Sequence, residues 1–373
     1  MIPLLFIFHI LLNLYIANCS FQISFFKELN KNYINQNLVI SPFSAYQILS
    51  LAANGAKGDT LSQMVSALGG KSLEELNKIN LQILNEAKKF TTVEIANAIM
   101  TKFNPDPKFV ASGQKYGASI QALKSVSQVN SWCNAKTHGK ISKILDSIPP
   151  NIKMILLNAV YFKGFWSKKF QKSLTMKKPF YNLNNKSKEK KVDRMKNVED
   201  FNYYEDKEVQ IVELPYMKDS MSAIVILPNE KKNINAFISE LNDEKLQSLL
   251  KKMSNQKVRL ELPKFKLEYT SELNNVLKKL GMNKPFDKHS ANFLGIGYDL
   301  YIDQILQKTY LKVDEEGTEA YAVTAIRFSP MPCLKRIPKI YPMVVDRPFL
   351  FLLKNKKLPK NNEMLFMSKI ENL

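Results

Sequence analysis

The sequence predicts a mixed α+β fold, with helices concentrated in its first third and β-strands in the remainder. Between residues 23 and 89, apolar residues recur at helical spacing and are interrupted by Ser, Gly and Asp residues. From residue 154 onward the apolar runs are short, often β-branched and bounded by turn residues, as buried strands are. Segregated helices and strands indicate α+β rather than alternating βαβ units.

Capping residues divide the first third into four expected helices. These span residues 23–29, 44–53, 59–68 and 72–89. Ser44 is expected to cap the second helix, because its hydroxyl can accept a bond from an unpaired N–H at the helix start. Ser72 and Glu75 form a capping box for the fourth.

The later part of the chain is expected to form strands around one further helix. That helix runs from Ser271 to Leu280 and ends at Gly281, which can adopt the left-handed cap. Residues 258–262 alternate apolar and charged side chains, as a half-buried strand does. The expected strands span residues 154–162, 211–227 with a hairpin turn at 217–220, 258–262, 343–345, 349–353 and 364–367.

No Pro-, Ser- or Gly-rich linker divides the 373 residues, so residues 20–373 are expected to form one domain. Residues 1–19 resemble a signal peptide: an apolar stretch is followed by small residues, with cleavage near Cys19. The protein is therefore expected to be secreted and extracellular; a buried first helix is the alternative. The apolar stretch is too short for a membrane span.

The formal net charge is +20, which attracts acidic surfaces such as heparin-like glycosaminoglycans. Lysines cluster at residues 186–191 and 354–360. A solvated Lys-rich surface is favoured over a specific polyanion site, and no nucleic-acid motif accompanies the charge. Asn185 begins a glycosylation sequon whose occupancy stays open.

Catalytic and metal-binding motifs are absent from the sequence. Its three His residues lack HExxH spacing, and no Cys-x-x-Cys, nucleophile elbow or P-loop occurs. We therefore expect neither an enzyme nor a cofactor. Cys133 and Cys333 are expected to be free thiols, with a disulfide between them as the less favoured alternative.

Seven colinear segments after the N-terminal stretch resemble the serpin family. They are residues 37–44 (NLVISPFS), 137–141 (THGKI), 158–166 (NAVYFKGFW), 213–216 (ELPY), 262–264 (LPK), 280–282 (LGM) and 346–349 (DRPF). The resemblance implies a monomer with three β-sheets, eight or nine helices and an exposed reactive loop at about residues 315–340. It also implies a suicide-substrate inhibitor of serine endopeptidases. In that mechanism the cleaved loop inserts into the main sheet and traps the acyl-enzyme. The alternative is a non-inhibitory serpin-fold protein that binds a ligand or polyanion and whose loop is only cleaved.

The first half of the loop has the alternating pattern of a strand that could insert into the main sheet. It follows a hinge at Glu315 and Gly317, where glycine permits the bend. The side chains that would face the core alternate along it and are uncharged: Thr318, Ala320, Ala322, Thr324 and Ile326. The opposite set, which includes Tyr321, is expected to face solvent.

The resemblance also implies residues that control sheet opening. Three polar residues are implied beneath the opening point: Ser41, Ser44 and Asn158. Gln307 stands where the family usually has a His; its amide can join a hydrogen-bond network but cannot change charge. Trp166 and a Glu315–Lys264 ion pair are expected to hold the state before insertion.

Two bonds compete as the reactive bond, and Arg327-Phe328 is a third option whose inserting arm would be short. The family's usual spacing from the hinge points to Met331-Pro332, although proline after a scissile bond is poorly accepted by serine proteases. Counting back from residue 348 points to Arg336-Ile337. A bond at Arg336 implies trypsin-like targets, and one at Met331 implies elastase- or chymotrypsin-like targets.

Overall fold

The computed structural model describes residues 20–373 except for residues 88, 90–92, 183–188, 218–219, 318–338 and 360. The expected signal peptide, the sequon at Asn185 and the loop beyond Gly317 thus lie outside the described residues. The α+β fold class is confirmed: the described chain has most of its long helices in its first third and mainly strands from residue 154 onward.

Nine α-helices occur in the described residues, within the expected eight or nine. They are α2 (Phe21–Asn30), α3 (Pro42–Ala53), α4 (Gly58–Ala67), α5 (Leu73–Ala87), α6 (Pro107–Lys115), α7 (Val126–Lys136), α8 (Ile234–Glu240), α9 (Asp243–Lys251) and α10 (Asn274–Lys279), with short 3₁₀ helices η1 (Lys172–Leu174) and η2 (Lys284–Phe286).

Two expected helix starts are wrong. Ser41, not Ser44, caps α3: the Ser41 hydroxyl accepts a bond from the Ser44 N–H at 3.3 Å, and Pro42 occupies the first turn, where its missing N–H costs nothing. Helix α10 begins only at Asn274, because Ser271 is still paired in a strand. Its end at Gly281 is as expected, with a φ of 99°.

The first sheet has five strands. Its order is β10 (Phe265–Glu272), β11 (Gln304–Val313), β4 (Met154–Phe162), β2 (Val93–Thr101) and β3 (Ser119–Ala122). Strands β11 and β4 at its centre run parallel, whereas β10 and β2 are antiparallel to the strands they join. Every residue of β4 is buried, as its continuous apolar run predicts.

The second sheet has nine strands. Its path is β1 (Leu38–Ile40), β14 (Met364–Ile370), β13 (Phe349–Asn355), β8 (Met221–Pro228), β7 (Val209–Pro215), β6 (Glu189–Glu205), β9 (Ser254–Pro263) and β12 (Ile340–Val344), with β5 (Met176–Tyr181) beside β6. Three sheets were expected from the resemblance, and two are found in the described residues. The 17-residue β6 pairs with β9 and, at its end, with β7. This pairing joins two of the three expected sheets into one nine-stranded sheet.

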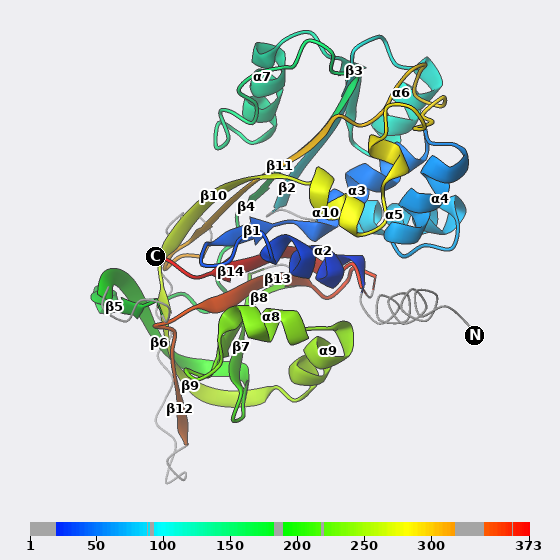
Figure 1. Cartoon of the computed structure of the whole chain (residues 1–373). Helices are drawn as coiled ribbons and strands as arrows, with labels where there is room; N and C mark the ends of the chain where they lie inside the picture. The colour runs from blue at the N-terminus through cyan, green and yellow to red at the C-terminus, as the bar shows by residue number, and fades with distance from the viewer. Residues whose placement is uncertain are drawn as a thin grey trace, which may run out of the picture.

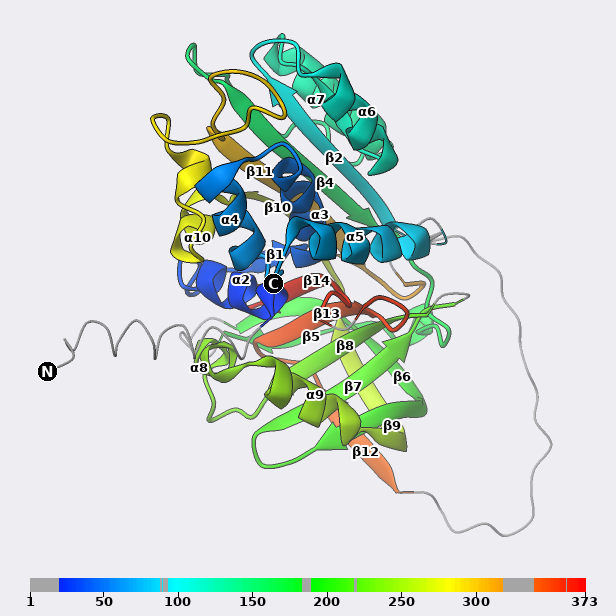
Figure 2. The same ribbon diagram turned by 90° about the vertical axis from the view of Figure 1, so that its right-hand side faces the viewer.

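Helix α3 is buried along its whole length between the two sheets, where it contacts β14 on one side and β4 and β2 on the other. Figures 1 and 2 show the five-stranded sheet in the upper half of the molecule and the nine-stranded sheet in the lower half. Helix α7 covers the other face of the five-stranded sheet, over a second hydrophobic cluster that includes Leu306 and Tyr310.

Candidate functional site

The chain reverses direction immediately after β11. Asp314 and Gly317 exchange backbone hydrogen bonds of 2.8 and 3.2 Å, which close a tight turn. Gly317 has a φ of 139°, and a Cβ added there would lie 2.0 Å from the Gly164 carbonyl oxygen. Only glycine therefore fits, which explains the hinge glycine read from the sequence.

The segment after β4 holds this turn by backbone contacts. The Trp166 N–H donates to the Glu316 carbonyl at 2.9 Å, and the Phe170 N–H donates to the Glu315 carbonyl at 3.0 Å. The Trp166 indole N–H also donates to the Asp314 carbonyl at 2.9 Å. The indole ring is buried and stacked on Tyr216 with centroids 4.4 Å apart, so its N–H is held in a fixed direction.

The ion pair expected between Glu315 and Lys264 is present at 3.0 Å, and Thr175 donates a 2.8 Å hydrogen bond to the same carboxylate. The Glu315 side chain is only 6% exposed, so burial favours its neutral form. The bonds from Thr175 and Lys264 outweigh burial, and the pKa of Glu315 lies below its usual value. The carboxylate is therefore charged and held.

Glu316 was not singled out by sequence reasoning, yet it is held as closely as its neighbour. Its carboxylate contacts Lys169 at 2.6 Å and Lys172 at 3.3 Å. The hydrogen bond from Lys169 is the main reason that the pKa of Glu316 is lowered. We call these contacts the hinge clasp; its members are Asp314, Glu315, Glu316 and Gly317 with Trp166, Lys169, Phe170, Lys172, Thr175 and Lys264.

A second set of contacts joins β11 and β4 near the middle of the sheet. The Gln307 amide donates to Asn158 Oδ1 at 2.7 Å and to the Ser41 carbonyl at 2.9 Å, while its oxygen accepts the Ser41 N–H at 2.8 Å. The Asn158 amide donates to Ser44 Oγ and, at 2.6 Å, to Asn97 Oδ1. We call these five residues the amide network. All are at most 8% exposed.

The amide network contains no ionisable side chain, so it does not change charge with pH. Asn97 was missed by sequence reasoning. Because β2 as a whole was not predicted, nothing indicated that Asn97 would pair directly with Asn158 across the sheet. The four residues that the resemblance implied, Ser41, Ser44, Asn158 and Gln307, lie together in this network.

The face of β11 that lies away from α3 is covered. Leu306 and Tyr310 on that face are each only 5% exposed. They pack in the cluster beneath α7, where Tyr310 makes an edge contact with Tyr161. A large side chain brought to this face would therefore need room under α7. The loop residues expected to face solvent, including Tyr321, lie outside the described residues.

Several predicted residues cannot be placed, because they lie outside the described residues. They are Thr318, Ala320, Ala322, Thr324, Met331, Pro332, Arg336 and Ile337. Cys133 is a buried free thiol, and burial raises its pKa to about 12. Among the residues that the structure describes, no cluster of three His, Cys, Asp or Glu side chains forms that would suit a metal ion. The described helices include none with the length and hydropathy of a membrane span.

Comparisons with known proteins identify the family of this chain. The family model described as "Serpin (serine protease inhibitor)" matches residues 16–373. The chain belongs to the serpin family. A leukocyte elastase inhibitor of Xenopus laevis is 32% identical over 366 residues, which cover 92% of this chain and 96% of the relative.

Solved serpin structures superpose on nearly the whole chain. Native tengpin, a thermophilic serpin, has a TM-score of 0.84 at 33% identity, with 96% of this chain and 93% of tengpin covered. Native protease nexin-1, solved with heparin, has a TM-score of 0.82 at 27% identity, with 96% and 98% covered. The fold and family of this serpin are thereby established.

Proposed function

We propose that this serpin is a suicide-substrate inhibitor of serine endopeptidases that traps the acyl-enzyme by inserting its reactive loop between β11 and β4. The observation that carries the proposal is the turn at 314–317, where the chain reverses direction at the end of β11. The membership of the chain in a family described as serine protease inhibitors supports the same reading.

The register of that turn also supports insertion. Continued from the Asp314–Gly317 bridge, it would set Thr318 opposite Val313 and Arg327 opposite Gln304, the far end of β11. Directly opposed residues of antiparallel strands share a face. The uncharged set Thr318, Ala320, Ala322, Thr324 and Ile326 would then lie opposite Val313, Leu311, Thr309, Gln307 and Ile305, which are all buried.

The relative stability of parallel and antiparallel strand pairs also supports insertion. Before insertion β11 and β4 form a parallel pair, which is slightly less stable per residue than an antiparallel pair. A strand that enters between them antiparallel to both would replace one parallel ladder by two antiparallel ladders. Tyr321 is the unfavourable position, because it would lie opposite Tyr310 in the crowded space under α7.

Both candidate bonds remain in the proposal. In the continued register Met331 would stand level with Leu300, a few residues past the end of β11, and Arg336 would stand level with Gly295. The shorter tether makes Met331-Pro332 the tighter trap, whereas the basic side chain makes Arg336-Ile337 the better trypsin-like substrate.

The decisive experiment is to incubate the protein with trypsin, elastase and chymotrypsin separately, then to look for an SDS-stable complex. Sequencing the released C-terminal peptide would identify the bond: Pro332 first for one candidate, Ile337 first for the other. Insertion predicts a complex and a large gain in thermal stability of the cleaved inhibitor. Cleavage without complex by every protease class would overturn the proposal in favour of a binding protein.

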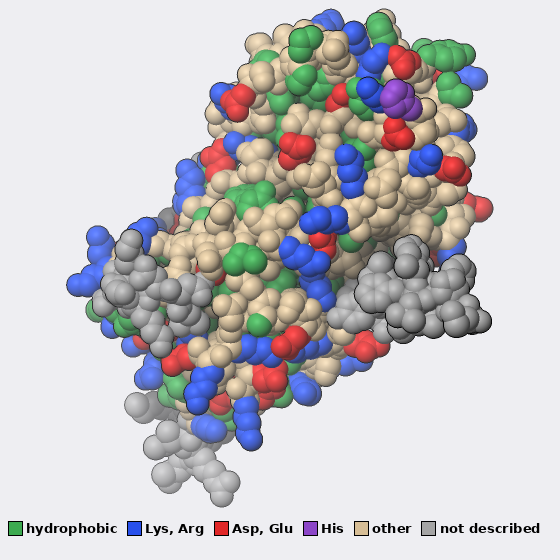
Figure 3. Space-filling model, viewed as in Figure 1, with side chains coloured by type: hydrophobic (Ala, Val, Ile, Leu, Met, Phe, Trp, Pro, Cys, Tyr) green, Lys and Arg blue, Asp and Glu red, His purple; other side chains and the backbone are tan. Residues whose placement is uncertain are grey.

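We further propose that heparin-like glycosaminoglycans bind the β5–β6 hairpin. Its exposed lysines include Lys177, Lys178, Lys190 and Lys191, and Figure 3 shows basic side chains around this corner of the molecule. The net charge of +20 and the heparin in the protease nexin-1 structure support the proposal. Heparin retention should fall when Lys177 and Lys191 are both changed to Gln, but not when Lys251 and Lys252, which are exposed elsewhere on the surface, are changed to Gln.

Secretion is also a proposal, and it rests on the apolar N-terminal stretch followed by small residues. Expression of the full chain in eukaryotic cells, with N-terminal sequencing of protein from the medium, tests it. A mature N-terminus near residue 20 is the expected result; retention of an uncleaved chain in the cells would contradict it.

A further inference from the structure

Ser20, which directly precedes α2, is bound to a carboxylate far away in the sequence. Its backbone N–H donates to Asp243 Oδ2, and its hydroxyl donates to Asp243 Oδ1 at 2.8 Å. Asp243 is the first residue of α9, so the contact joins the starts of two helices. Helix α2 contacts α8 and lies above α8 and α9 in Figure 1.

Helix capping does not explain this contact. A serine before a helix usually accepts a bond from an N–H of its own helix, but the Ser20 side chain makes no such bond. Asp243 is not needed as the cap of α9 either, because the Asn242 side chain already accepts the Lys245 N–H at 2.7 Å. The side chains of Ser20 and Asp243 are thus directed at each other rather than at their own helices.

The packing of α2 fixes the position of the Ser20 nitrogen. Phe21, the next residue, is only 6% exposed. The Gln22 side chain exchanges two hydrogen bonds with the Met364 backbone, at 3.0 and 3.1 Å, and so attaches the first turn of α2 to β14. The nitrogen that precedes these residues is therefore held beside the carboxylate.

The carboxylate of Asp243 has room for a cationic partner. Among the residues that the structure describes, no Lys or Arg side chain forms an ion pair with it, although the chain has 54 Lys and Arg against 34 Asp and Glu. Lys245, the nearest lysine in the sequence, pairs with Glu208 and Glu240 instead. A positive charge on the Ser20 nitrogen would give Asp243 an ion-pair partner.

The sequence supplies that charge if the N-terminal stretch is removed at one particular bond. Signal peptides are cut after small residues in an A-x-A-like pattern. Ala17 and Cys19 place small residues third and first before the Cys19-Ser20 bond, and no other bond between residues 15 and 24 has small residues at both places. Hydrolysis there consumes one water molecule: the Cys19 carbonyl becomes a carboxylate, and the Ser20 nitrogen takes up both water protons and becomes an ammonium group.

We propose that the mature chain begins at Ser20 and that its new α-ammonium group forms an ion pair with Asp243 that joins α2 to α9. The inference rests on the proposed secretion and adds to it the bond that is cut and the residue that receives the new terminus. Before cleavage the nitrogen is an uncharged amide with one N–H; afterwards it has three N–H groups and a positive charge. Charge-assisted hydrogen bonds are the stronger kind, so removal of the N-terminal stretch stabilises the start of the fold.

The first test is N-terminal sequencing of the protein that eukaryotic cells secrete into the medium. We expect one terminus, at Ser20, followed by Phe21 and Gln22. A mature terminus at any other residue would overturn the inference while leaving the proposed secretion intact. An uncleaved chain retained in the cells would contradict secretion itself, and the inference with it.

The second test isolates the charge. The chain that begins at Ser20 is compared with the same chain acetylated at its N-terminus, which keeps an N–H but carries no charge. We expect acetylation to raise the equilibrium constant of urea unfolding about 3- to 5-fold at low salt, and less at about 0.5 M salt. In Asp243→Asn, acetylation should change this constant by less than about twofold, because the partner of the charge is gone.

The matched control is Glu244→Gln. Glu244 is an exposed carboxylate in the same first turn of α9, but Ser20 donates to Asp243 and not to Glu244. Acetylation should therefore keep its full effect in this variant. An acetylation effect in Asp243→Asn as large as in the wild type would show that the terminal charge acts without this contact, and would overturn the ion pair.

Discussion

Strands β4 and β11 are held together by two sets of contacts that differ in chemistry. The amide network near their middle is neutral and buried, and its members come from β2, β4, β11 and the start of α3 with its cap Ser41. The hinge clasp at their end relies on ion pairs in which Lys172 is 67% exposed. Substitution of its residues weakens a buried neutral network, but salt and acid do not. Exposed ion pairs are weakened by substitution and also by salt and acid.

This difference suggests that the two sets of contacts have separate roles. The amide network sets how costly it is to separate the strands at all, because every bond broken there leaves a buried polar group. The clasp sets how readily the chain at 314–317 is released, and solution conditions can adjust it. Substitutions that act on only one of the two sets of contacts test whether their roles are separate.

The largest effect is expected for Asn158→Ala. The substitution removes the bonds that Asn158 makes to Gln307, Asn97 and Ser44, and we expect the free energy of unfolding to fall by about 3 kcal/mol. Urea unfolding of the uncleaved protein measures it. Asn202→Ala is the control: its amide makes one bond, to Glu213 in the partly exposed sheet region, and should cost about 1 kcal/mol. A loss below that of the control would contradict the role given to the network.

The next effect is a pH dependence created by Gln307→His. A neutral imidazole can replace part of the amide's bonding, but no carboxylate belongs to the network to stabilise the imidazolium. Burial therefore lowers the folded pKa of the new His, and stability should be retained above its unfolded pKa of about 6.5 and lost as the pH falls below it.

Unfolding at about pH 8 and pH 5.5 measures this effect. The variant should lose on the order of 1 kcal/mol more than the wild type across the interval. Wild-type Gln307 carries no titratable proton, so equal losses in both proteins would show that the site is not as dry as its 1% exposure indicates.

The sequence predicted the neutral part of this site better than the charged part. Ser41, Ser44, Asn158 and Gln307 lie in motifs that the serpin resemblance carries, and their contacts follow from the strand pairing. Lys169, Lys172 and Thr175 carry no motif; they reach the hinge only because the segment after β4 turns back over residues 314–317. A lysine among 54 Lys and Arg residues gives no signal of its own.

The fold shows the same limit. Strands with uniform apolar or alternating patterns, such as β4 and β9, were predicted, because burial on two faces or on one leaves a direct pattern. Strand β2 was missed, since its exposed start and its Asn97 interrupt the apolar run. The start of helix α10 was predicted three residues too early. In the sequence Ser271 resembles a helix cap, and only its pairing with Gln307 shows that it lies in a strand.

A moderate effect is expected in the hinge clasp, where Glu316→Gln and Lys169→Gln form a double-mutant cycle. The 2.6 Å contact is partly buried, so we expect a coupling of about 1 kcal/mol at low salt that shrinks at about 0.5 M salt. The amide-network variant should keep its full effect at both salt concentrations. Coupling that does not change with salt would contradict the contrast.

Acid should act on the clasp with a defined sign. The pKa values of Glu315 and Glu316 are lowered in the folded protein, by hydrogen bonds and ion pairs that for Glu315 overcome burial. Their stabilisation is therefore present above the unfolded value of about 4.3 and is lost as the pH falls through the folded values. Release of residues 314–317 by acid, followed by limited proteolysis, should precede global unfolding in the wild type and should depend less steeply on pH in Glu316→Gln, which keeps only Glu315.

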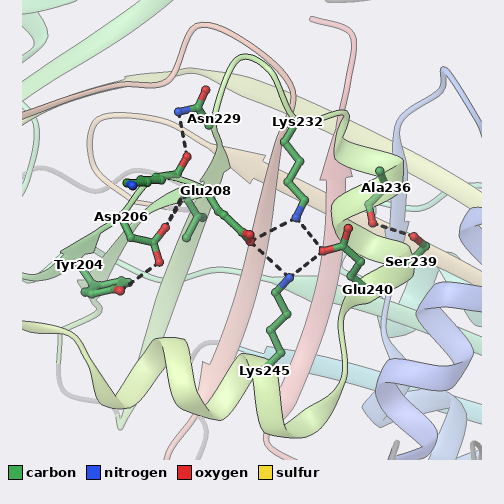
Figure 4. A network of polar contacts seen from close by, with 11 residues as sticks. Tyr204, Asp206, Glu208, Asn229, Lys232, Ala236, Ser239, Glu240 and Lys245 are labelled. Atoms are coloured by element: carbon green, nitrogen blue, oxygen red, sulfur yellow. Dashed lines mark hydrogen bonds and ion pairs between the residues drawn. The ribbon is translucent and has the colours of Figure 1, made fainter.

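The smallest effect is expected from the densest charge cluster of the molecule's described part. Lys232 and Lys245 each contact both Glu208 and Glu240, at 2.7–3.6 Å, and their hydrogen bonds lower the pKa of Glu240 to about 2 (Figure 4). Both lysines also lie over the Phe237 ring, at 5.8 and 5.2 Å. The cluster joins α8 and α9 to the β6–β7 turn, in the nine-stranded sheet, where the proposed insertion moves nothing.

Lys245→Gln should therefore lower the free energy of unfolding by about 0.5 kcal/mol, less at high salt, and leave the rate of complex formation unchanged. Glu316→Gln, with fewer ion pairs but a place beside the loop that the proposed insertion moves, should change that rate. If Lys245→Gln altered complex formation as much as Glu316→Gln, position at the hinge would not be what distinguishes the clasp. The number of ion pairs in a cluster then says little about function; what counts is whether the contacts must break when the chain moves.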